Sequence, residues 1–78
     1  MNIDERIEAD PAICGGRPRV KGTRLTVEFL LGLKAAGWSE AQIFEGYPHL
    51  TEADLRAVFA FAKALIEEDQ YLSFSRVA

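Results

Sequence analysis

The chain has 78 residues, of which 49% are hydrophobic and 27% are charged, and its formal net charge at pH 7 is −3. This length fits one compact domain and leaves no room for a second. No apolar run approaches the roughly 20 residues that cross a bilayer, and no basic and then apolar leader opens the chain. We therefore expect a small, soluble, cytoplasmic protein that does not enter a membrane.

One cysteine, Cys14, and one histidine, His49, restrict the chemistry that the chain can perform. A lone cysteine forms no internal disulfide, which suits a reducing compartment, and neither residue has a neighbour with which to hold a metal ion. No pair of titratable groups is placed for acid–base or nucleophilic work. We expect no catalytic residue, no metal and no cofactor, and hence a protein that is not an enzyme.

The net charge hides an uneven distribution along the chain. The segment from Gly15 to Thr26 holds four basic residues and no acid, a net charge of +4. The rest of the chain holds five basic residues against twelve acidic ones, a net charge of −7. The basic segment can meet a polyanion, whereas the acidic remainder can meet a cationic partner or stay solvated.

Residues 1–25 form the first of three predicted parts and show no helical period. Their isolated apolar residues are separated by turn formers, a pattern typical of short strands and turns. Gly15-Gly16 predicts one tight turn, and Gly22-Thr23 predicts a second. We expect an extended, hairpin-like arm that carries the basic residues.

Residues 26–69 form the second part, in which apolar residues recur at helical spacing. Thr26 is the expected N-cap of a first helix, which Gly37 ends. Ser39 opens a capping box, Ser-Glu-Ala-Gln, and begins a second helix that stops at Gly46.

A third and longest helix is predicted from Thr51 to about Asp69. Its cap signal is weaker than a full capping box, because Asp54 stands where Glu or Gln is preferred. One apolar stripe is expected to face the core: Leu55, Val58, Phe59, Ala62, Leu65 and Ile66. Phe61 lies off this stripe, and a helix that is apolar on two faces needs a second surface to cover it. We therefore expect Phe61 to make a dimer contact.

Two short helices followed by a longer one are the arrangement of a trihelical, homeodomain-like helix-turn-helix core. The predicted fold is therefore mainly α, with this core preceded by the extended arm. In such a core the third helix lies near base edges, but here its two basic residues are offset by acids. The arm must then supply most contacts to phosphates. The residues expected to bind DNA are Arg17, Arg19, Lys21, Thr23, Arg24 and Arg56.

The third part, residues 70–78, is more apolar than a frayed chain end requires. The residues expected to bind a partner protein are Tyr71, Leu72, Phe74 and Val77. The segment could pack on its own core, pair across a dimer, or dock as an added strand on another protein. The sequence leaves these three placements open.

The run from Gly15 to Val27, GGRPRVKGTRLTV, is similar to the motif G-G-x-P-x-[IV]-x-G-T-R-[IL]-x-V of domain-of-unknown-function family 433. The similarity continues through the runs GWSE, YP and LTEADL, and it covers roughly residues 5 to 65. The family usually has at most one basic residue where this chain has Arg17-Pro18-Arg19. The resemblance implies a VapB-type antitoxin with a helix-turn-helix-like fold. It also implies a PIN-like ribonuclease toxin as the partner that is neutralised, and operator DNA as a second ligand.

Two functions from different classes follow. In the first, the chain is the antitoxin of a type II toxin–antitoxin pair, a homodimer that binds its toxin through residues 70–78 and its operator through the arm. In the second, it is a protein–protein interaction module without DNA binding, whose basic arm holds an acidic surface of a partner or of a sister subunit.

Overall fold

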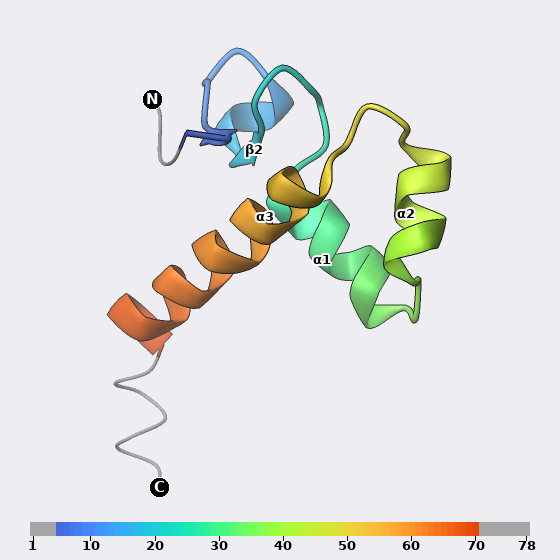
Figure 1. Ribbon diagram of the computed structural model, residues 1–78. Coiled ribbons are helices and arrows are strands. Elements are labelled where there is room, and N and C mark those ends of the chain that lie inside the picture. The colour runs from blue at the N-terminus through green and yellow to red at the C-terminus, as the bar shows by residue number, and fades with distance from the viewer. Residues whose placement is uncertain (1–4, 71–78) are drawn as a thin grey trace, which may run out of the picture.

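A computed structural model describes residues 5–70 of the chain (Figure 1). Three α-helices follow one another: α1 (Val27–Ala35), α2 (Glu40–Gly46) and α3 (Glu52–Leu65). A π-helical turn, η2 (Ile66–Gln70), extends α3. The predicted third helix is therefore α-helical to Leu65, and its last residues form this wider turn.

A short antiparallel sheet precedes the helices, as the hairpin prediction required. Strand β1 (Ile7–Glu8) pairs with β2 (Arg19–Val20), and a 3₁₀ turn, η1 (Cys14–Gly16), lies between them. The described chain is thus mainly helical, with a two-stranded hairpin near its N-terminus.

Strand β2 is held on both sides. Opposite β1 it meets the segment that leads into α1, where the Val20 amide donates to the Leu25 carbonyl at 2.9 Å. The Gly22-Thr23 turn makes this possible, because Gly22 has a φ of 80° and the Thr23 hydroxyl donates to the Val20 carbonyl at 2.8 Å. The arm is therefore part of the folded body, with Ile7 and Val20 in the core.

The start and end of α1 follow the predicted signals. The Thr26 hydroxyl accepts the Phe29 amide at 3.1 Å and caps the first turn. At the other end Gly37 has a φ of 96°, which glycine adopts without steric cost. The Gly37 amide donates to the Lys34 carbonyl, and the next amide donates to the Leu33 carbonyl, which makes a Schellman motif.

The capping box of α3 is complete, although its sequence signal is the weaker one. The Thr51 hydroxyl accepts the Asp54 amide at 3.1 Å, and Asp54 Oδ2 accepts the Thr51 amide at 3.0 Å. The second carboxylate oxygen, Oδ1, accepts from the Arg6 guanidinium at 3.1 Å. Asp54 thus closes the helix start and also ties the arm to α3.

Replacing Thr51 by alanine should lower the free energy of unfolding by about 1 kcal/mol, because the hydroxyl half of the box is lost. Urea denaturation measures this change. Thr51→Ser keeps the hydroxyl and should stay close to the parent protein. Equal losses for the two variants would contradict the capping role.

The core lies where α1, α3 and the hairpin meet. Its buried residues are Ile7, Val20, Val27, Leu30, Ile43, Leu50, Leu55, Ala57 and Val58. Helix α3 contacts both α1 and β1. The side of α3 that faces the core therefore includes Ala57, which is buried, and Phe61, which packs against the buried residues. The predicted stripe is therefore correct for Leu55 and Val58 but wrong for Phe59, which is 39% exposed.

The C-terminal half of α3 projects beyond the rest of the body (Figure 1). Leu65 and Ile66, which the stripe placed in the core, are 45% and 50% exposed there. Among residues 5–70, no helix has both the length and the apolar character that a membrane crossing needs.

Candidate functional site

The residues predicted to bind DNA do not share one surface, and Arg19 is the clearest departure. Its side chain is only 5% exposed. Nη1 donates to the Thr23 carbonyl at 2.7 Å, and Nη2 donates to Glu8 Oε1 at 2.7 Å, while Nε has no partner among the described residues. A guanidinium that is buried and held in this way cannot reach a phosphate. The assignment of Arg19 to DNA binding is corrected: it joins β1, β2 and the following turn.

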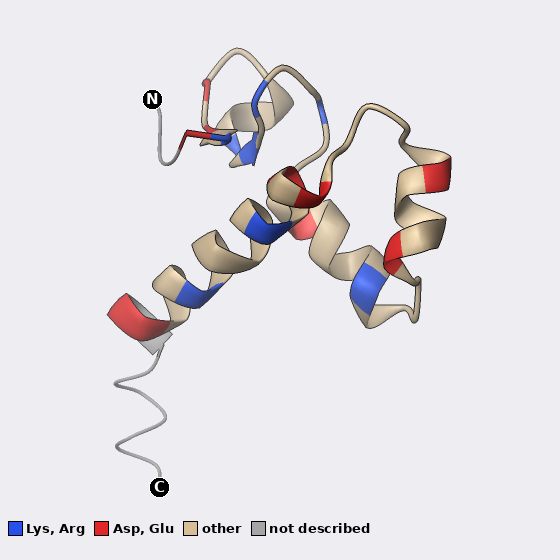
Figure 2. Cartoon of the chain, in the orientation of Figure 1, with Lys and Arg blue, Asp and Glu red and all other residues tan. Residues whose placement is uncertain are grey.

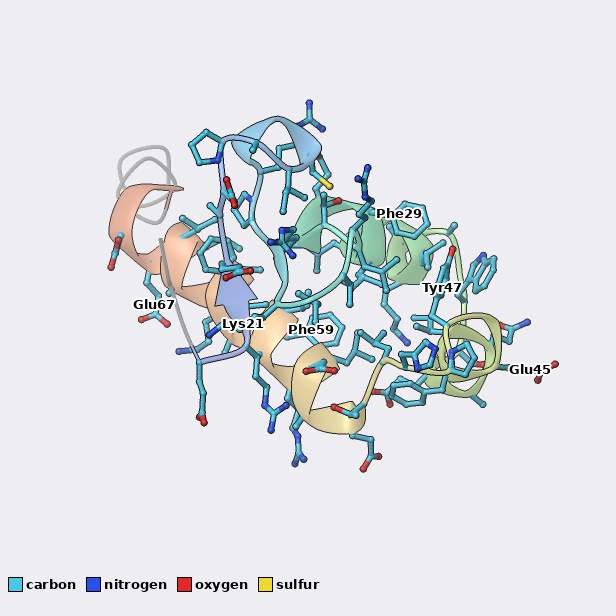
Figure 3. All side chains as sticks on the ribbon, turned by 90° about the horizontal axis from the view of Figure 1, so that it is seen from above. Lys21, Phe29, Glu45, Tyr47, Phe59 and Glu67 are labelled. Atoms are coloured by element: carbon cyan, nitrogen blue, oxygen red, sulfur yellow. The ribbon has the colours of Figure 1, made fainter. Side chains whose placement is uncertain are left out.

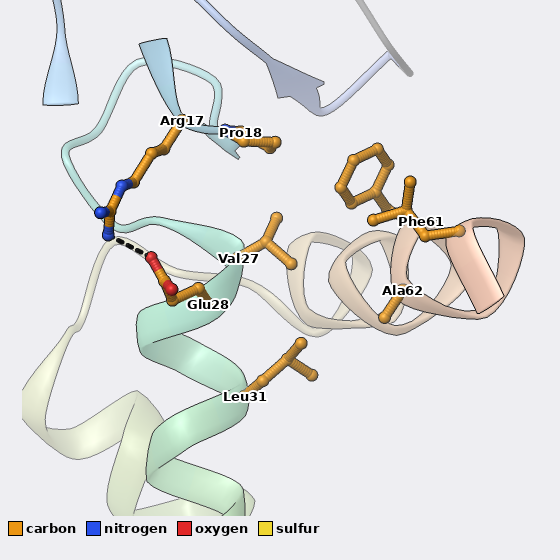
Figure 4. A pocket seen from close by; sticks show the side chains of 8 residues that line it. Arg17, Pro18, Val27, Glu28, Leu31, Phe61 and Ala62 are labelled. Carbon is orange, nitrogen blue, oxygen red and sulfur yellow. Dashed lines mark hydrogen bonds and ion pairs between the residues drawn. The ribbon is translucent and has the colours of Figure 1, made fainter. Parts of the chain in front are cut away.

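Arg17 is exposed, but its charge is already compensated within the chain. Its guanidinium pairs with the Glu28 carboxylate in the first turn of α1 (Figure 4). Both side chains are well exposed to solvent, so the pair adds little to stability. It also lowers the net charge that Arg17 presents to a polyanion.

Lys21 and Arg24 are the exposed cations of the arm that form no ion pair with any described residue. They flank the turn at Gly22-Thr23. Thr23 itself is half-buried, and its hydroxyl donates within the turn and accepts the Leu25 amide at 3.0 Å. Thr23 therefore shapes the turn that presents the two cations.

Arg56 lies on the exposed face of α3, where Figure 2 shows basic residues along the helix and acidic residues at both of its ends. Arg56 forms no ion pair within the part of the chain that the structure describes, whereas Lys63 pairs with Glu67 one turn later. Phe59 and Ala60 lie between these two cations on the exposed face. This face thus offers one free cation beside an apolar surface.

An apolar groove runs between α1 and α3 and is named the α1–α3 groove here (Figure 4). Its volume is about 410 Å³. The apolar residues that line it are Pro18, Val27, Leu31, Phe61, Ala62 and Leu65, and the Arg17–Glu28 pair stands at its rim. Phe61, the predicted dimer contact, is half-buried against the core and also lines this groove.

A second pocket of about 330 Å³ brings together two motifs that are far apart in sequence. Its lining residues are Gly22, Thr23, Leu25, Gly46, Tyr47, Pro48, His49 and Leu50. Tyr47 is held by an edge-to-face contact with Phe29, whose ring centroid is 5.9 Å away (Figure 3). His49 is exposed beside this pocket and has no His, Cys, Asp or Glu cluster around it among residues 5–70.

Sequence reasoning missed both hollows. Leu31 of α1 and Leu65 of α3 line the α1–α3 groove. The apolar spacing of the third predicted helix places Leu65 in the core instead. The helical period indicates which side of a helix is apolar, but it does not say whether a neighbour covers that side completely. The residues predicted to bind a partner, Tyr71, Leu72, Phe74 and Val77, lie outside the described residues.

Comparison with known proteins gives one family and one solved structure. The model of the family described as "Protein of unknown function (DUF433)" matches residues 7–62. The crystal structure of a DUF433 member protein from Anabaena variabilis ATCC 29413 is similar over 95% of this chain and 69% of that chain, with a TM-score of 0.74 and 26% sequence identity. No curated protein matches. Because the family match spans more than half of the sequence, the chain belongs to the DUF433 family.

Proposed function

We propose that this chain is the antitoxin of a type II toxin–antitoxin pair. It neutralises a PIN-like ribonuclease toxin by binding it, and it binds its own operator DNA as a homodimer. The motifs GGRPRVKGTRLTV and YPHLTEADL support this proposal through the VapB-type antitoxin role that their resemblance implies. The observation that carries this proposal is the apolar surface that the described residues leave exposed to solvent.

That apolar surface supports the partner half of the proposal. The large apolar side chains exposed on the described residues are Phe29, Trp38, Phe59, Leu65 and Ile66. Leu65 also lines the open α1–α3 groove, and an apolar surface of this kind is where a partner protein can bind. A domain of this length also buries a smaller share of its surface than a larger domain does, and it gains stability from a partner.

The charge distribution supports a ribonuclease as that partner. Outside the segment from Gly15 to Thr26 the chain carries a net charge of −7. An enzyme that binds RNA needs a cationic entrance for the phosphates, and an acidic protein complements such a surface and speeds association with it.

The DNA half of the proposal depends on three exposed cations, Lys21, Arg24 and Arg56. We propose that α1, α2 and α3 act as a homeodomain-like helix-turn-helix, with Arg56 on the exposed face of the third helix and the two arm cations on phosphates. Three contacts in each protomer make six in a homodimer. The logarithm of affinity should then fall with the logarithm of salt concentration with a slope of about −5.

A salt titration of binding to duplex DNA from the chain's own promoter tests this half. Lys21→Ala and Arg24→Ala should each lower the magnitude of the slope by about 2, because a dimer loses two phosphate contacts. Arg17→Ala is the matched control and should change the slope less, since Glu28 already pairs with Arg17. Absence of binding at low salt, with and without the partner, would contradict the DNA half.

The second candidate function is a protein–protein interaction module without DNA binding. Burial of Arg19 and pairing of Arg17 with Glu28 favour it, because only two of the four basic residues between Gly15 and Thr26 are then left exposed and without an ion pair to any residue of the described range 5–70. This module should form the same complex with its partner protein and show no affinity for the promoter duplex at low salt. The salt titration therefore separates the two functions.

A further inference from the structure

We propose that the pocket between the Gly22-Thr23 turn and the loop from Gly46 to Leu50, named the turn–loop pocket here, binds one base of single-stranded DNA. Lys21 and Arg24 contact the phosphates next to that base. This site goes beyond the proposed function, which concerns a protein partner and duplex DNA, and it does not depend on either of them.

The turn–loop pocket has walls that hydrogen bonds hold in place. The Thr23 hydroxyl closes the turn by donating to the Val20 carbonyl at 2.8 Å. The Leu50 amide closes the loop by donating to the Tyr47 carbonyl at 3.0 Å, and Leu50 is itself part of the buried core. The pocket is therefore pre-formed, and its volume of about 330 Å³ lies within the range of ligand sites.

The lining of the pocket matches a flat ring that is mostly apolar. Leu25 and Pro48 contribute apolar surface, while Tyr47 and His49 contribute rings. Tyr47 is half-buried and is held edge to face by Phe29, with a centroid distance of 5.9 Å (Figure 3). His49 is exposed beside the pocket. Nucleobases stack on tyrosine and histidine rings, and such stacking tolerates different base sequences.

The charge around the pocket favours a polyanion. None of the eight described residues that line it is acidic. Lys21 directly precedes Gly22 and Arg24 directly follows Thr23, and both cations are exposed and form no ion pair within residues 5–70. Sites for single-stranded nucleic acid combine ring surfaces with cations that follow the backbone. The turn–loop pocket brings these two features together.

The polar groups of the pocket wall favour DNA over RNA. The Thr23 hydroxyl closes the turn and also accepts the Leu25 amide at 3.0 Å, and the Thr23 carbonyl accepts from Arg19 at 2.7 Å. The Tyr47 carbonyl accepts the Leu50 amide. These groups are already bonded within the fold, so they leave a ribose 2′-hydroxyl without a fresh partner among them.

The need to expose a base favours a single strand over a duplex. A base enters a pocket only after it leaves its stack and its pair, and this costs least where the strand is already single. Thymine matches the apolar lining best, because its methyl group makes apolar contacts. A thymidine strand is therefore the probe of choice.

Fluorescence anisotropy at low salt, with the full chain, tests the base contact. The probe is a labelled octamer of thymidine nucleotides, and its control is an abasic octamer with the same phosphates. We expect the thymidine octamer to bind about tenfold more tightly, because it alone carries bases. Equal affinities, or no binding of the thymidine octamer, would overturn the proposal. A uridine RNA octamer that binds as tightly as the thymidine octamer would overturn the assignment to DNA.

Variants separate the ring contact from the phosphate contacts. His49→Ala should weaken binding of the thymidine octamer about fivefold and leave the abasic octamer unchanged, whereas His49→Phe keeps a flat ring and should retain most of the affinity. Lys21→Ala and Arg24→Ala should weaken both octamers by the same factor. His49 is exposed, so its replacement leaves the core intact, which urea denaturation checks. Equal weakening of both octamers by His49→Ala would contradict the base contact.

Arg56→Ala distinguishes this site from the proposed operator contact. Arg56 lies on the exposed face of α3, outside the pocket lining, and its loss should change affinity for the thymidine octamer by less than about twofold. Loss of duplex binding with intact octamer binding would contradict the operator proposal and support this one.

A protein segment is the competing occupant of the turn–loop pocket. The probe for it is an acidic peptide of alternating aspartate and leucine. If this peptide displaces the labelled octamer at a lower concentration than unlabelled octamer does, the pocket belongs to a protein partner and the proposal is wrong. We expect unlabelled octamer to be the stronger competitor.

Discussion

Replacing Arg19 by alanine is expected to lower the free energy of unfolding by about 3 kcal/mol, although the residue belongs to the most basic segment of the chain. The substitution leaves the Glu8 carboxylate without its partner and the Thr23 carbonyl without its 2.7 Å donor. Breaking a buried pair from one side costs more than the pair contributes, because the remaining group stays desolvated. For 78 residues the total stability is about 4 to 12 kcal/mol, so the loss is a large fraction of it.

Urea denaturation followed by circular dichroism measures the Arg19 effect. Lys21→Ala is the matched control, because Lys21 is an exposed cation two residues away that forms no ion pair with a described residue. It should change stability by less than about 0.5 kcal/mol. If Arg19→Ala were as stable as Lys21→Ala, the guanidinium would not hold the two strands together.

Replacing Ile43 by alanine is expected to cost about 3 kcal/mol and to loosen α2 from the rest of the fold. Ile43 is fully buried and is the one residue of α2 in the buried core, so this helix depends on it more than α1 or α3 depends on any single residue. Large-to-small substitution removes transfer free energy and leaves a cavity that the surroundings fill only in part.

Two measurements follow the loosening of α2. Urea denaturation gives the loss of stability, with Glu45→Ala, exposed on the same helix, as a nearly neutral control. Trp38 fluorescence reports on α2 directly, because the indole lies beside Gly46. A Trp38 spectrum that shifts in Ile43→Ala is the expected result. Unchanged stability in Ile43→Ala would contradict the role of Ile43 in holding α2.

The helix limits could be predicted because their causes are local. The Thr26 cap, the capping box at Ser39 and the Schellman motif at Gly37 each involve residues within five positions of one another. Such interactions are written into short stretches of sequence. The reciprocal bonds at Thr51 and Asp54 show that a shorter acid can also complete the box, which the usual Glu or Gln preference understates.

The burial of Arg19 could not be predicted, because it depends on contacts with residues that are not its neighbours in the sequence. The alternation of polar and apolar residues in Arg19-Val20-Lys21 predicts that Arg19 and Lys21 are both exposed. Instead, Arg19 is buried together with Val20, the other residue of β2. The reason is that β2 lies between β1 and the segment before α1, and Glu8 across the sheet accepts from the guanidinium. The number of basic residues between Gly15 and Thr26 therefore overestimates how many of them can contact phosphates.

The predicted core face of the third helix is partly wrong for a related reason. A single apolar stripe assumes one neighbour, but α3 contacts both α1 and β1. Its buried face is consequently wider and rotated, which places Phe61 against the core and Phe59 on the surface. The α1–α3 groove arises from the same packing, because α3 extends past the elements that cover its first half.

Neutralisation of a ribonuclease by this chain is the property on which the antitoxin proposal depends most directly. The measurement is the cleavage rate of a fluorescent RNA by the purified PIN-like ribonuclease from the neighbouring open reading frame, titrated with the full chain. We predict that activity falls linearly to near zero at a fixed stoichiometric ratio. The chain truncated after Gln70 should need at least tenfold more protein for the same inhibition. Full ribonuclease activity in the presence of a large excess of the full chain would contradict the proposal.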